Sequence, residues 1–358
     1  MNEPTESVAS DVNAPPVAPL RVPEVPERVL LDLVTDCNLK CPMCVVHGAV
    51  TDPRLKDYLK KSMSLENAAK VLDQVMATKP LIMPGMWSEP MMNPNFKEHV
   101  RQMKERGLTL AMNTNGLKMN AELAQFIVDI EFDSVFFSVD AVTPETLNKV
   151  RGITRLDLLH KAVELLLTTR GNRTLPRIGV SMTLQETNRH ERDAFVEFWT
   201  KRVDAVRIGE IWKEGHFTFK VQGERVPCPS LYTTLAVNTN GNVSICCLDS
   251  FNGTNMGNVF QKGVRAVWHG PELTAMRQLH ERGQWDQIPL CKNCDRWASY
   301  QYTEEVKDNL LIRRSPEYTY YNRIDRLHNW HHELHGTHQE GKEKALTESC
   351  DVELPASA

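Results

Sequence analysis

Two groups of cysteines are the residues of this chain best suited to chemistry. The segment TDCNLKCPMC contains Cys37, Cys41 and Cys44. After a long cysteine-free stretch, a second group follows with Cys228, Cys246, Cys247, Cys291 and Cys294. The first twenty residues lack both the basic start and the apolar stretch of a secretion signal, so we expect a cytoplasmic protein. Thiols stay reduced in that compartment, and clustered reduced cysteines indicate metal binding rather than disulfides.

The first group offers three thiols within a short loop. A 4Fe–4S cluster takes four protein thiolates, so three would leave one iron open for an exchangeable ligand. Electron transfer into a bound substrate requires such an open position. The alternative is a structural zinc site, which closes tetrahedrally with a fourth Cys or His. His47 is the nearest candidate for that fourth ligand.

The second group offers enough thiols for one closed site. Cys228 and Cys246 flank a predicted hairpin, and Cys291 and Cys294 form a Cys-x2-Cys pair. Four thiols suit one iron–sulfur cluster, while zinc in a ribbon-like module is the alternative. Cys247 could replace its neighbour Cys246 as the ligand.

Short apolar runs alternate with amphipathic stretches over the first part of the chain. The runs predict six strands at 28–35, 79–86, 108–114, 133–140, 177–184 and 204–211. The stretches between them predict helices at 64–78, 93–107, 120–130, 156–171 and 191–202. Apolar strands separated by helices form a parallel sheet covered by helices, either a partial barrel or an open sheet. Both place active sites at the carboxyl ends of the strands.

The remaining segments are predicted to differ from this α/β body, which spans 26–215. We expect residues 1–25 to form a disordered leader and 339–358 a disordered tail, since both are polar or Pro-rich without periodicity. The sequence predicts a small separate module over 216–300, with a β-hairpin around Asn240-Gly241. Residues 301–338 are predicted to form a charged helical extension.

The charge balance excludes some partners. The chain has 42 Lys plus Arg against 46 Asp plus Glu, a net charge of -4 and a sequence pI near 6.3. Without a basic excess, a nucleic acid partner is not expected. No apolar stretch is long enough to cross a membrane, so no membrane partner is expected either.

The spacing Cys-x3-Cys-x2-Cys after the first strand resembles the signature of the radical S-adenosylmethionine (SAM) superfamily. The resemblance implies a partial (β/α)6 TIM-like barrel whose Cys37, Cys41 and Cys44 hold a 4Fe–4S cluster that also binds SAM. It implies an enzyme that generates a 5′-deoxyadenosyl radical and removes hydrogen from a substrate. An external one-electron reductant, such as flavodoxin or ferredoxin, would supply the electron.

Polar residues near the later strand ends match the same superfamily in order along the chain. WSEP (87–90) resembles the segment that binds the SAM amino group, with Ser88 in place of the usual Gly. Taken singly, the other matches have plainer interpretations as a turn, a helix cap and a solvated helix charge. The resemblance implies SAM contacts by Glu89, Asn115, Ser138, Asp140 and Arg151, the last through a bidentate contact to the SAM carboxylate.

The second cysteine group resembles the twitch or SPASM auxiliary module of radical SAM enzymes. The resemblance implies one auxiliary 4Fe–4S cluster held by Cys228, Cys246, Cys291 and Cys294, with Cys247 as a buried small side chain. The spacing is similar to that of the family's aminocyclitol (2-deoxy-scyllo-inosamine) dehydrogenases.

This similarity favours the two-electron oxidation of a small molecule in natural-product biosynthesis, for instance a sugar, cyclitol or nucleoside. Arg207 and Glu210, near the end of the sixth predicted strand, are catalytic candidates, with Glu210 preferred as the substrate base. Ribosomal-peptide maturation by crosslinking or epimerisation ranks second, because the leader is too short for a peptide-recognition domain. Redox-neutral chemistry such as decarboxylation, and a non-catalytic zinc or iron–sulfur scaffold, remain further alternatives.

Overall fold

Six parallel strands form the centre of the fold and follow one another in chain order across the sheet. The computed structural model describes residues 20–48, 55, 58–213, 216–217, 219, 221, 224–249 and 253–329. The strands are β1 (Arg28–Leu31), β2 (Leu81–Met83), β3 (Thr109–Thr114), β4 (Ser134–Ser138), β5 (Arg177–Leu184) and β6 (Ala205–Glu210). All six predicted strands are therefore confirmed, and their order is that of a partial (β/α)6 barrel.

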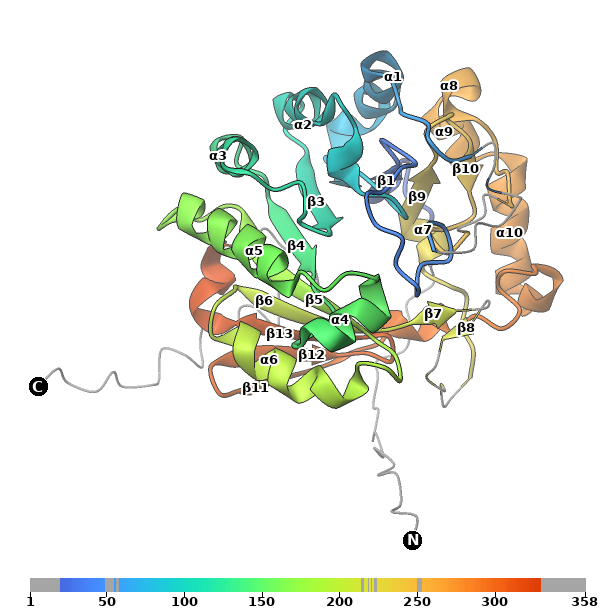
Figure 1. Ribbon diagram of the computed structural model, residues 1–358. Coiled ribbons are helices and arrows are strands. Elements are labelled where there is room, and N and C mark those ends of the chain that lie inside the picture. The colour runs from blue at the N-terminus through green and yellow to red at the C-terminus, as the bar shows by residue number, and fades with distance from the viewer. Residues whose placement is uncertain are drawn as a thin grey trace, which may run out of the picture.

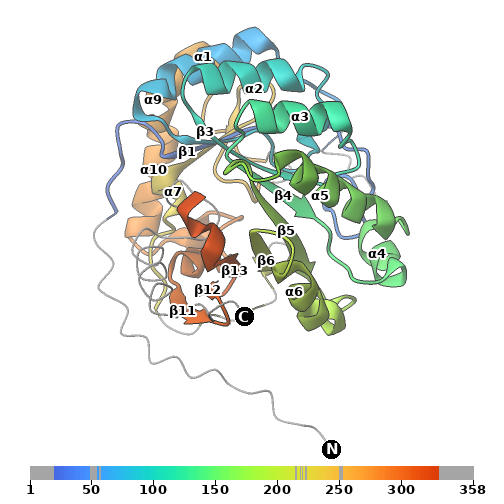
Figure 2. The same ribbon diagram turned by 90° about the vertical axis from the view of Figure 1, so that its left-hand side faces the viewer.

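Helices cover the outer face of this sheet (Figures 1 and 2). They are α1 (Leu65–Val75), α2 (Phe96–Glu105), α3 (Ala121–Asp129), α4 (Pro144–Arg151), α5 (Leu156–Arg170) and α6 (Arg192–Thr200). Local sequence fixes where several begin. The side chains of Ser64, Asn120 and Thr143 accept backbone N–H groups in the first turns of α1, α3 and α4.

The hairpin near Asn240-Gly241 is confirmed, and the C-terminal module that contains it is joined to the barrel sheet. Strand β9 (Thr234–Val237) pairs antiparallel with β10 (Val243–Ser244) and, on its other side, parallel with β1. The cysteine-rich segment therefore extends the barrel sheet instead of standing apart from it. Its helices are α7 (Ser230–Thr233), α8 (Val259–Lys262), α9 (Val264–Trp268) and α10 (Pro271–Glu281).

The predicted helical extension over 301–338 is wrong for residues 303–323. Residues 303–323 form the strands β11 (Thr303–Lys307), β12 (Leu310–Arg314) and β13 (Tyr318–Arg323). Strand β13 pairs antiparallel with β6, so these strands close the other side of the barrel sheet. Asp308 and Asn309 have φ of 51° and 61°. A two-residue hairpin loop with both residues left-handed is a type I′ turn, which ends any helix there.

Shorter elements connect these parts. A two-stranded sheet is formed by β7 (Trp212–Lys213) and β8 (His216–Phe217). The 3-10 helices are η2 (Met76–Thr78), η3 (Pro90–Met92), η4 (Arg189–Glu191), η5 (Trp285–Gln287), η6 (Arg296–Tyr300) and η7 (Ile324–Asn329). No helix within the described ranges combines the length and the apolarity needed to cross a bilayer.

The prediction of a disordered leader over 1–25 is wrong for residues 20–25. Leu20 and Val22 pack against the core, and the backbone oxygen of Pro23 accepts a 2.9 Å hydrogen bond from Trp268 Nε1. Residues 20–25 are therefore ordered, because they cover α9. The rest of the predicted leader (1–19), the end of the predicted extension (330–338) and the predicted tail (339–358) lie outside the described residues.

Candidate functional site

The first three cysteines lie in the loop that follows β1, at the carboxyl end of the parallel strands. Cys41 is buried, while Cys37 and Cys44 are half-buried. All eight cysteines of the described part of the chain are free thiols. Burial raises the pKa of Cys37 to about 11 and also raises that of Cys41. Thiols in this setting stay protonated until a cation stabilises the thiolates, so the donor set suits a metal group that displaces protons on binding.

The zinc alternative requires its ligands to converge on one ion. The backbone N–H of His47 donates to Cys44 Sγ at 3.2 Å. Across the described ranges, no three His, Cys, Asp or Glu side chains are arranged to hold a single metal ion. A 4Fe–4S cluster takes one thiolate on each iron, so its ligands need not meet at one atom.

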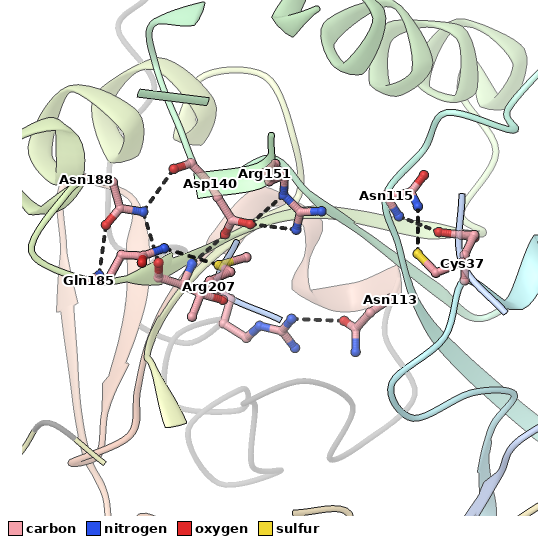
Figure 3. A network of polar contacts seen from close by, with 11 residues as sticks. Cys37, Asn113, Asn115, Asp140, Arg151, Gln185, Asn188 and Arg207 are labelled. Atoms are coloured by element: carbon pink, nitrogen blue, oxygen red, sulfur yellow. Dashed lines mark hydrogen bonds and ion pairs between the residues drawn. The ribbon is translucent and has the colours of Figure 1, made fainter. Parts of the chain in front are cut away.

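Glu89 connects the ends of β2 and β3 beneath the cysteine loop. Its side chain is 1% exposed, and burial raises the pKa of its carboxyl group. Oε1 accepts from Thr114 Oγ1 at 2.9 Å, and Oε2 accepts from the backbone N of Asn115 at 2.7 Å. Asn115 Nδ2 in turn donates to Asn38 Oδ1 at 2.7 Å and lies 3.8 Å from Cys37 Sγ (Figure 3). Glu89 and Asn115 are therefore brought together beside Cys37.

The turn after Asn115 requires a glycine. Gly116 has φ of 76°, and a Cβ built there would lie 2.8 Å from the ring of Phe137. A side chain at this position would be both strained and too close to β4. The Thr-Asn-Gly segment is thus fixed in one conformation by the same contacts that hold Glu89.

Asp140 and Arg151 form a buried ion pair on the other side of the site (Figure 3). Arg151 Nε donates to Asp140 Oδ2 at 2.6 Å, and its side chain is 8% exposed. Burial alone would lower the pKa of Arg151, but Asp140, Cys41 and Cys37 raise it. Arg151 is therefore not a solvated helix charge, and it stands near the cysteine loop as a fixed cation. Ser138 ends β4 two residues before Asp140 and is half-buried.

The structure separates the two catalytic candidates. Arg207 Nη2 donates to Asn113 Oδ1 at 2.9 Å (Figure 3), and its guanidinium lies 5.2 Å from the ring centroid of Phe136. Glu210 instead lines a cleft with Ile208 beside α6, where its Oε2 lies 3.1 Å from Arg189 Nη2. Residues three apart on a strand point to opposite faces. Arg207 and Glu210 therefore point to opposite faces of β6.

Asp32, at the end of β1, is a residue that sequence reasoning missed. It is fully buried and accepts hydrogen bonds from Tyr58 Oη at 2.8 Å, Ser88 Oγ at 3.0 Å and the backbone N of Met86 at 3.3 Å. Ser88, which stands where the superfamily usually has Gly, thus anchors the WSEP segment to β1. An acidic residue within the apolar run LLDLV was the available signal.

We expect Asp32→Asn to change how stability depends on pH. Burial raises the pKa of Asp32 from 3.8 to about 6, despite the three hydrogen bonds. Because the pKa is raised in the folded state, protonated Asp32 stabilises the fold. This contribution to stability is complete below the ordinary pKa of Asp and is lost as the pH rises through about 6. The free energy of unfolding of the wild type should therefore fall by about 2 kcal/mol relative to Asp32→Asn between pH 4 and pH 8. Chemical denaturation of both proteins across this range measures the difference, and parallel curves would contradict it.

Four cysteines of the second group line one cavity. They are Cys228, Cys246, Cys291 and Cys294, contributed by the segments before α7, after β10 and after η5. Cys247 is not among the lining residues, and its backbone oxygen accepts a 2.7 Å hydrogen bond from Trp87 Nε1. Burial raises the pKa of both Cys228 and Cys291 to about 12. As in the first group, the thiols fit a metal group that displaces their protons.

Comparisons with family models agree with both sites. The model described as the radical SAM superfamily matches residues 32–198, which include the first three cysteines. The SPASM model, described as an iron–sulfur cluster-binding domain, matches residues 228–295, which include the second group. These domains imply SAM and a 4Fe–4S cluster in the barrel, and further iron–sulfur binding in the C-terminal part.

Curated relatives match parts of the chain. A tungsten-containing aldehyde ferredoxin oxidoreductase cofactor-modifying protein of Pyrococcus furiosus is 32% identical over 34% of this chain and 32% of its own. The GTP 3′,8-cyclase of Chlorobaculum tepidum is 27% identical over 53% of this chain and 58% of its own. The SAM-dependent 2-deoxy-scyllo-inosamine dehydrogenase of Niallia circulans is 35% identical over 20% of this chain and 28% of its own. The chain thus spans less than two thirds of each of these relatives.

Solved structures share the fold. BtrN in complex with AdoMet and 2-DOIA has a TM-score of 0.50 at 14% identity, covering 75% of this chain and 92% of that chain. SuiB of Streptococcus suis bound to S-adenosylmethionine has a TM-score of 0.58 at 13% identity, covering 76% of this chain and 72% of that chain. These likenesses concern the fold alone. The two domain matches, over residues 32–198 and 228–295, give the family: the chain belongs to the radical SAM superfamily and carries a SPASM-type iron–sulfur module.

Proposed function

We propose that this radical SAM enzyme removes hydrogen from a small polyhydroxylated molecule, such as a sugar, cyclitol or nucleoside, and oxidises it by two electrons. Cys37, Cys41 and Cys44 are the proposed ligands of the cluster in the barrel. Cys228, Cys246, Cys291 and Cys294 are the proposed ligands of one auxiliary cluster. When bound, the barrel cluster and SAM supply the 5′-deoxyadenosyl radical, and the protein supplies binding, orientation and exclusion of water.

The polar residues at the strand ends are the proposed SAM contacts. Arg151 is a buried cation near Cys41, which suits it to orient a carboxylate beside the cysteine loop. Asn115 lies 3.8 Å from Cys37 Sγ and can position groups next to that thiolate. We propose that Glu89, Ser138 and Asp140 complete this set, Glu89 by holding the loops through its hydrogen bonds as well as by its charge.

One observation supports the oxidative reaction: four thiols line the C-terminal cavity. Four thiolates saturate a 4Fe–4S cluster and leave no iron open for substrate. A saturated cluster can still exchange electrons, which is the role that a two-electron oxidation requires of a second centre. The fold shared with BtrN, whose structure contains 2-DOIA, supports a cyclitol-like substrate.

A second candidate function is maturation of a ribosomal peptide. It is supported by the fold shared with SuiB, which has also been solved with its precursor peptide SuiA at a TM-score of 0.56, and by several relatives named mycofactocin maturase MftC. The two candidates differ in substrate size, because a peptide must enter as an extended chain.

Deuterium transfer into 5′-deoxyadenosine distinguishes these functions. The reconstituted protein would be incubated with SAM, a one-electron reductant and panels of carbon-deuterated cyclitols, sugars, nucleosides and peptides. We expect deuterium in 5′-deoxyadenosine, and a ketone product, with a member of the first three panels. Transfer from peptides alone would support the second candidate, and transfer from none of the panels would contradict both.

Substitutions at Arg207 and Glu210 should have unequal effects on turnover. Burial alone would lower the pKa of Arg207, but Tyr320, Tyr318 and Asp140 raise it, so its guanidinium stays charged and suits a substrate oxygen rather than the role of base. We expect Arg207→Gln to lower kcat/KM by about 10- to 100-fold, because this factor corresponds to the free energy of one hydrogen bond to a charged group. Glu210→Gln, on the opposite face of β6, should remain within about twofold of wild type. Steady-state kinetics measure both, and the reverse order would restore Glu210 as the base.

The surroundings required by this function are reducing. We propose that the enzyme works in the cytoplasm, where its thiols stay reduced, and that flavodoxin or ferredoxin delivers the electron. Redox-neutral chemistry remains the outcome if deuterium is transferred but the product has the oxidation state of the substrate.

A further inference from the structure

Four nitrogen donors around the C-terminal cavity have no hydrogen-bond partner. They are Arg225 Nε, His280 Nε2, Arg296 Nε and Trp297 Nε1, each buried and unpaired within the part of the chain that the structure describes. The same four residues line the cavity together with its four thiols. Buried donors are nearly always paired in folded proteins, because an unmade bond is costly. Four unpaired donors at one cavity therefore indicate that their acceptors belong to its occupant.

The ring of His280 is held with its donor fixed. Its Nδ1 accepts a 3.3 Å hydrogen bond from the backbone N of Cys228. An imidazole nitrogen that accepts carries no proton, so the proton of the neutral ring is on Nε2. Nε2 is the unpaired atom, and it is therefore a donor.

The two guanidinium groups are also fixed. Arg225 Nη2 donates to the backbone oxygen of Cys291 at 2.7 Å, and its guanidinium lies 4.6 Å from the ring centroid of Trp285. Arg296 Nη1 donates to Glu317 Oε1 at 2.5 Å, and the Glu317 side chain is 3% exposed. In both arginines the paired atoms are Nη atoms, which leaves Nε for another acceptor. The donors are thus positioned before anything enters the cavity.

We propose that Arg225, His280, Arg296 and Trp297 donate N–H hydrogen bonds to the sulfur atoms of the auxiliary cluster and thereby raise its reduction potential. This inference rests on the proposed function, which assigns the cluster to this cavity. Hydrogen bonds to cluster sulfurs, together with net charge and burial, set the potential of such clusters. Reduction adds negative charge, which N–H donors and guanidinium groups stabilise.

The raised potential fits the electron balance of the proposed oxidation. The alcohol carbon loses a hydrogen atom to the deoxyadenosyl radical, and the hydroxyl loses its proton to a base or to water. One electron then remains to be removed before the C=O bond is complete. A cluster poised at higher potential is the better acceptor for that electron.

Redox titration followed by electron paramagnetic resonance tests the proposal. The full-length chain would carry Cys37→Ala, Cys41→Ala and Cys44→Ala, so that only the C-terminal cluster contributes. We expect Trp297→Phe and Arg296→Gln each to lower the midpoint potential in this background. The double variant should lower the equilibrium constant for reduction of the cluster at least tenfold, which corresponds to a midpoint potential lower by about 59 mV for one electron. Trp212→Phe is the matched control, because Trp212 Nε1 is also buried and unpaired but does not line the cavity.

An unchanged potential in variants that keep about four irons per chain would overturn the inference while leaving the proposed function intact. Pulsed resonance on the same background, labelled with ¹⁵N-arginine or ¹⁵N-tryptophan, needs no substitution at the cavity. Nitrogen hyperfine coupling to the reduced cluster is expected, and its absence would overturn the donor contacts even if the substituted proteins fail to fold. Zinc in place of iron would overturn the proposed function and the inference together.

Discussion

Replacing Cys37, Cys41 and Cys44 together with Ala should halve the iron content and abolish SAM cleavage. The reconstituted wild type should hold about eight irons per chain, and the variant about four, all in the C-terminal cavity. The effect is complete rather than partial because the open iron is the only proposed route for the electron into SAM. Iron analysis, with an assay for 5′-deoxyadenosine from SAM and dithionite, measures both expectations.

Cys350→Ala is the control for this experiment, since Cys350 belongs to neither cysteine group. It should keep full iron content and activity. Cleavage of SAM by the triple variant, or zinc in place of iron in the wild type, would contradict the assignment of the barrel cluster.

Cys246→Ala and Cys247→Ala should have opposite outcomes although the residues are neighbours. Cys246 lines the cavity with three other thiols, whereas Cys247 is absent from its lining. We expect Cys246→Ala to lose the auxiliary cluster and the oxidised product while it continues to form 5′-deoxyadenosine. Cys247→Ala should retain about eight irons and product formation.

Three measurements on both variants separate the possible causes: iron content, 5′-deoxyadenosine formation and product analysis. Retained cleavage in Cys246→Ala shows that the barrel is folded, so a missing product then reports on the auxiliary cluster alone. If Cys247→Ala is the variant that loses iron, the ligand assignment must be exchanged between the two residues.

Local patterns predicted most of the barrel but not how it is closed. The run DSVFFSVD becomes β4, which is buried over residues 134–137, because parallel strands covered on both faces consist of continuous apolar residues. The parallel pairing of β9 with β1 joins Arg28 to Thr234, far apart in the chain, and no local pattern specifies such a contact. The module therefore looked separate when only sequence was considered.

The wrong helical prediction near the C-terminus has a physical reason. In β11 the sequence TEEVK alternates between exposed and half-buried residues, a period of two that its charges conceal. Cross-strand ion pairs, such as Arg313 with Glu304, stabilise it as a strand. The turn residues Asp308 and Asn309 were the signal that could have corrected the prediction.

Site residues that belong to a local sequence motif could be predicted. Those whose roles depend on contacts between distant segments could not. The cysteines follow from their spacing, and Glu89 follows from the resemblance of WSEP to a superfamily segment. The separation of Arg207 from Glu210 also followed from their odd spacing on one strand, and it should have been expected. The ion pair of Arg151 with Asp140 depends on how α4 packs, and the role of Asp32 depends on Tyr58 and Ser88 reaching it from other segments.

The pairing of β9 with β1 and of β13 with β6 has a consequence for fragments of this protein. Both outer strands of the parallel barrel are covered by strands that follow residue 230 in the chain. A fragment ending near residue 215 would expose the unpaired N–H and C=O groups of β1 and β6 at the same time, and bare strand edges template intermolecular pairing. Attempts to express the barrel alone should therefore give aggregates, whatever becomes of its cysteines.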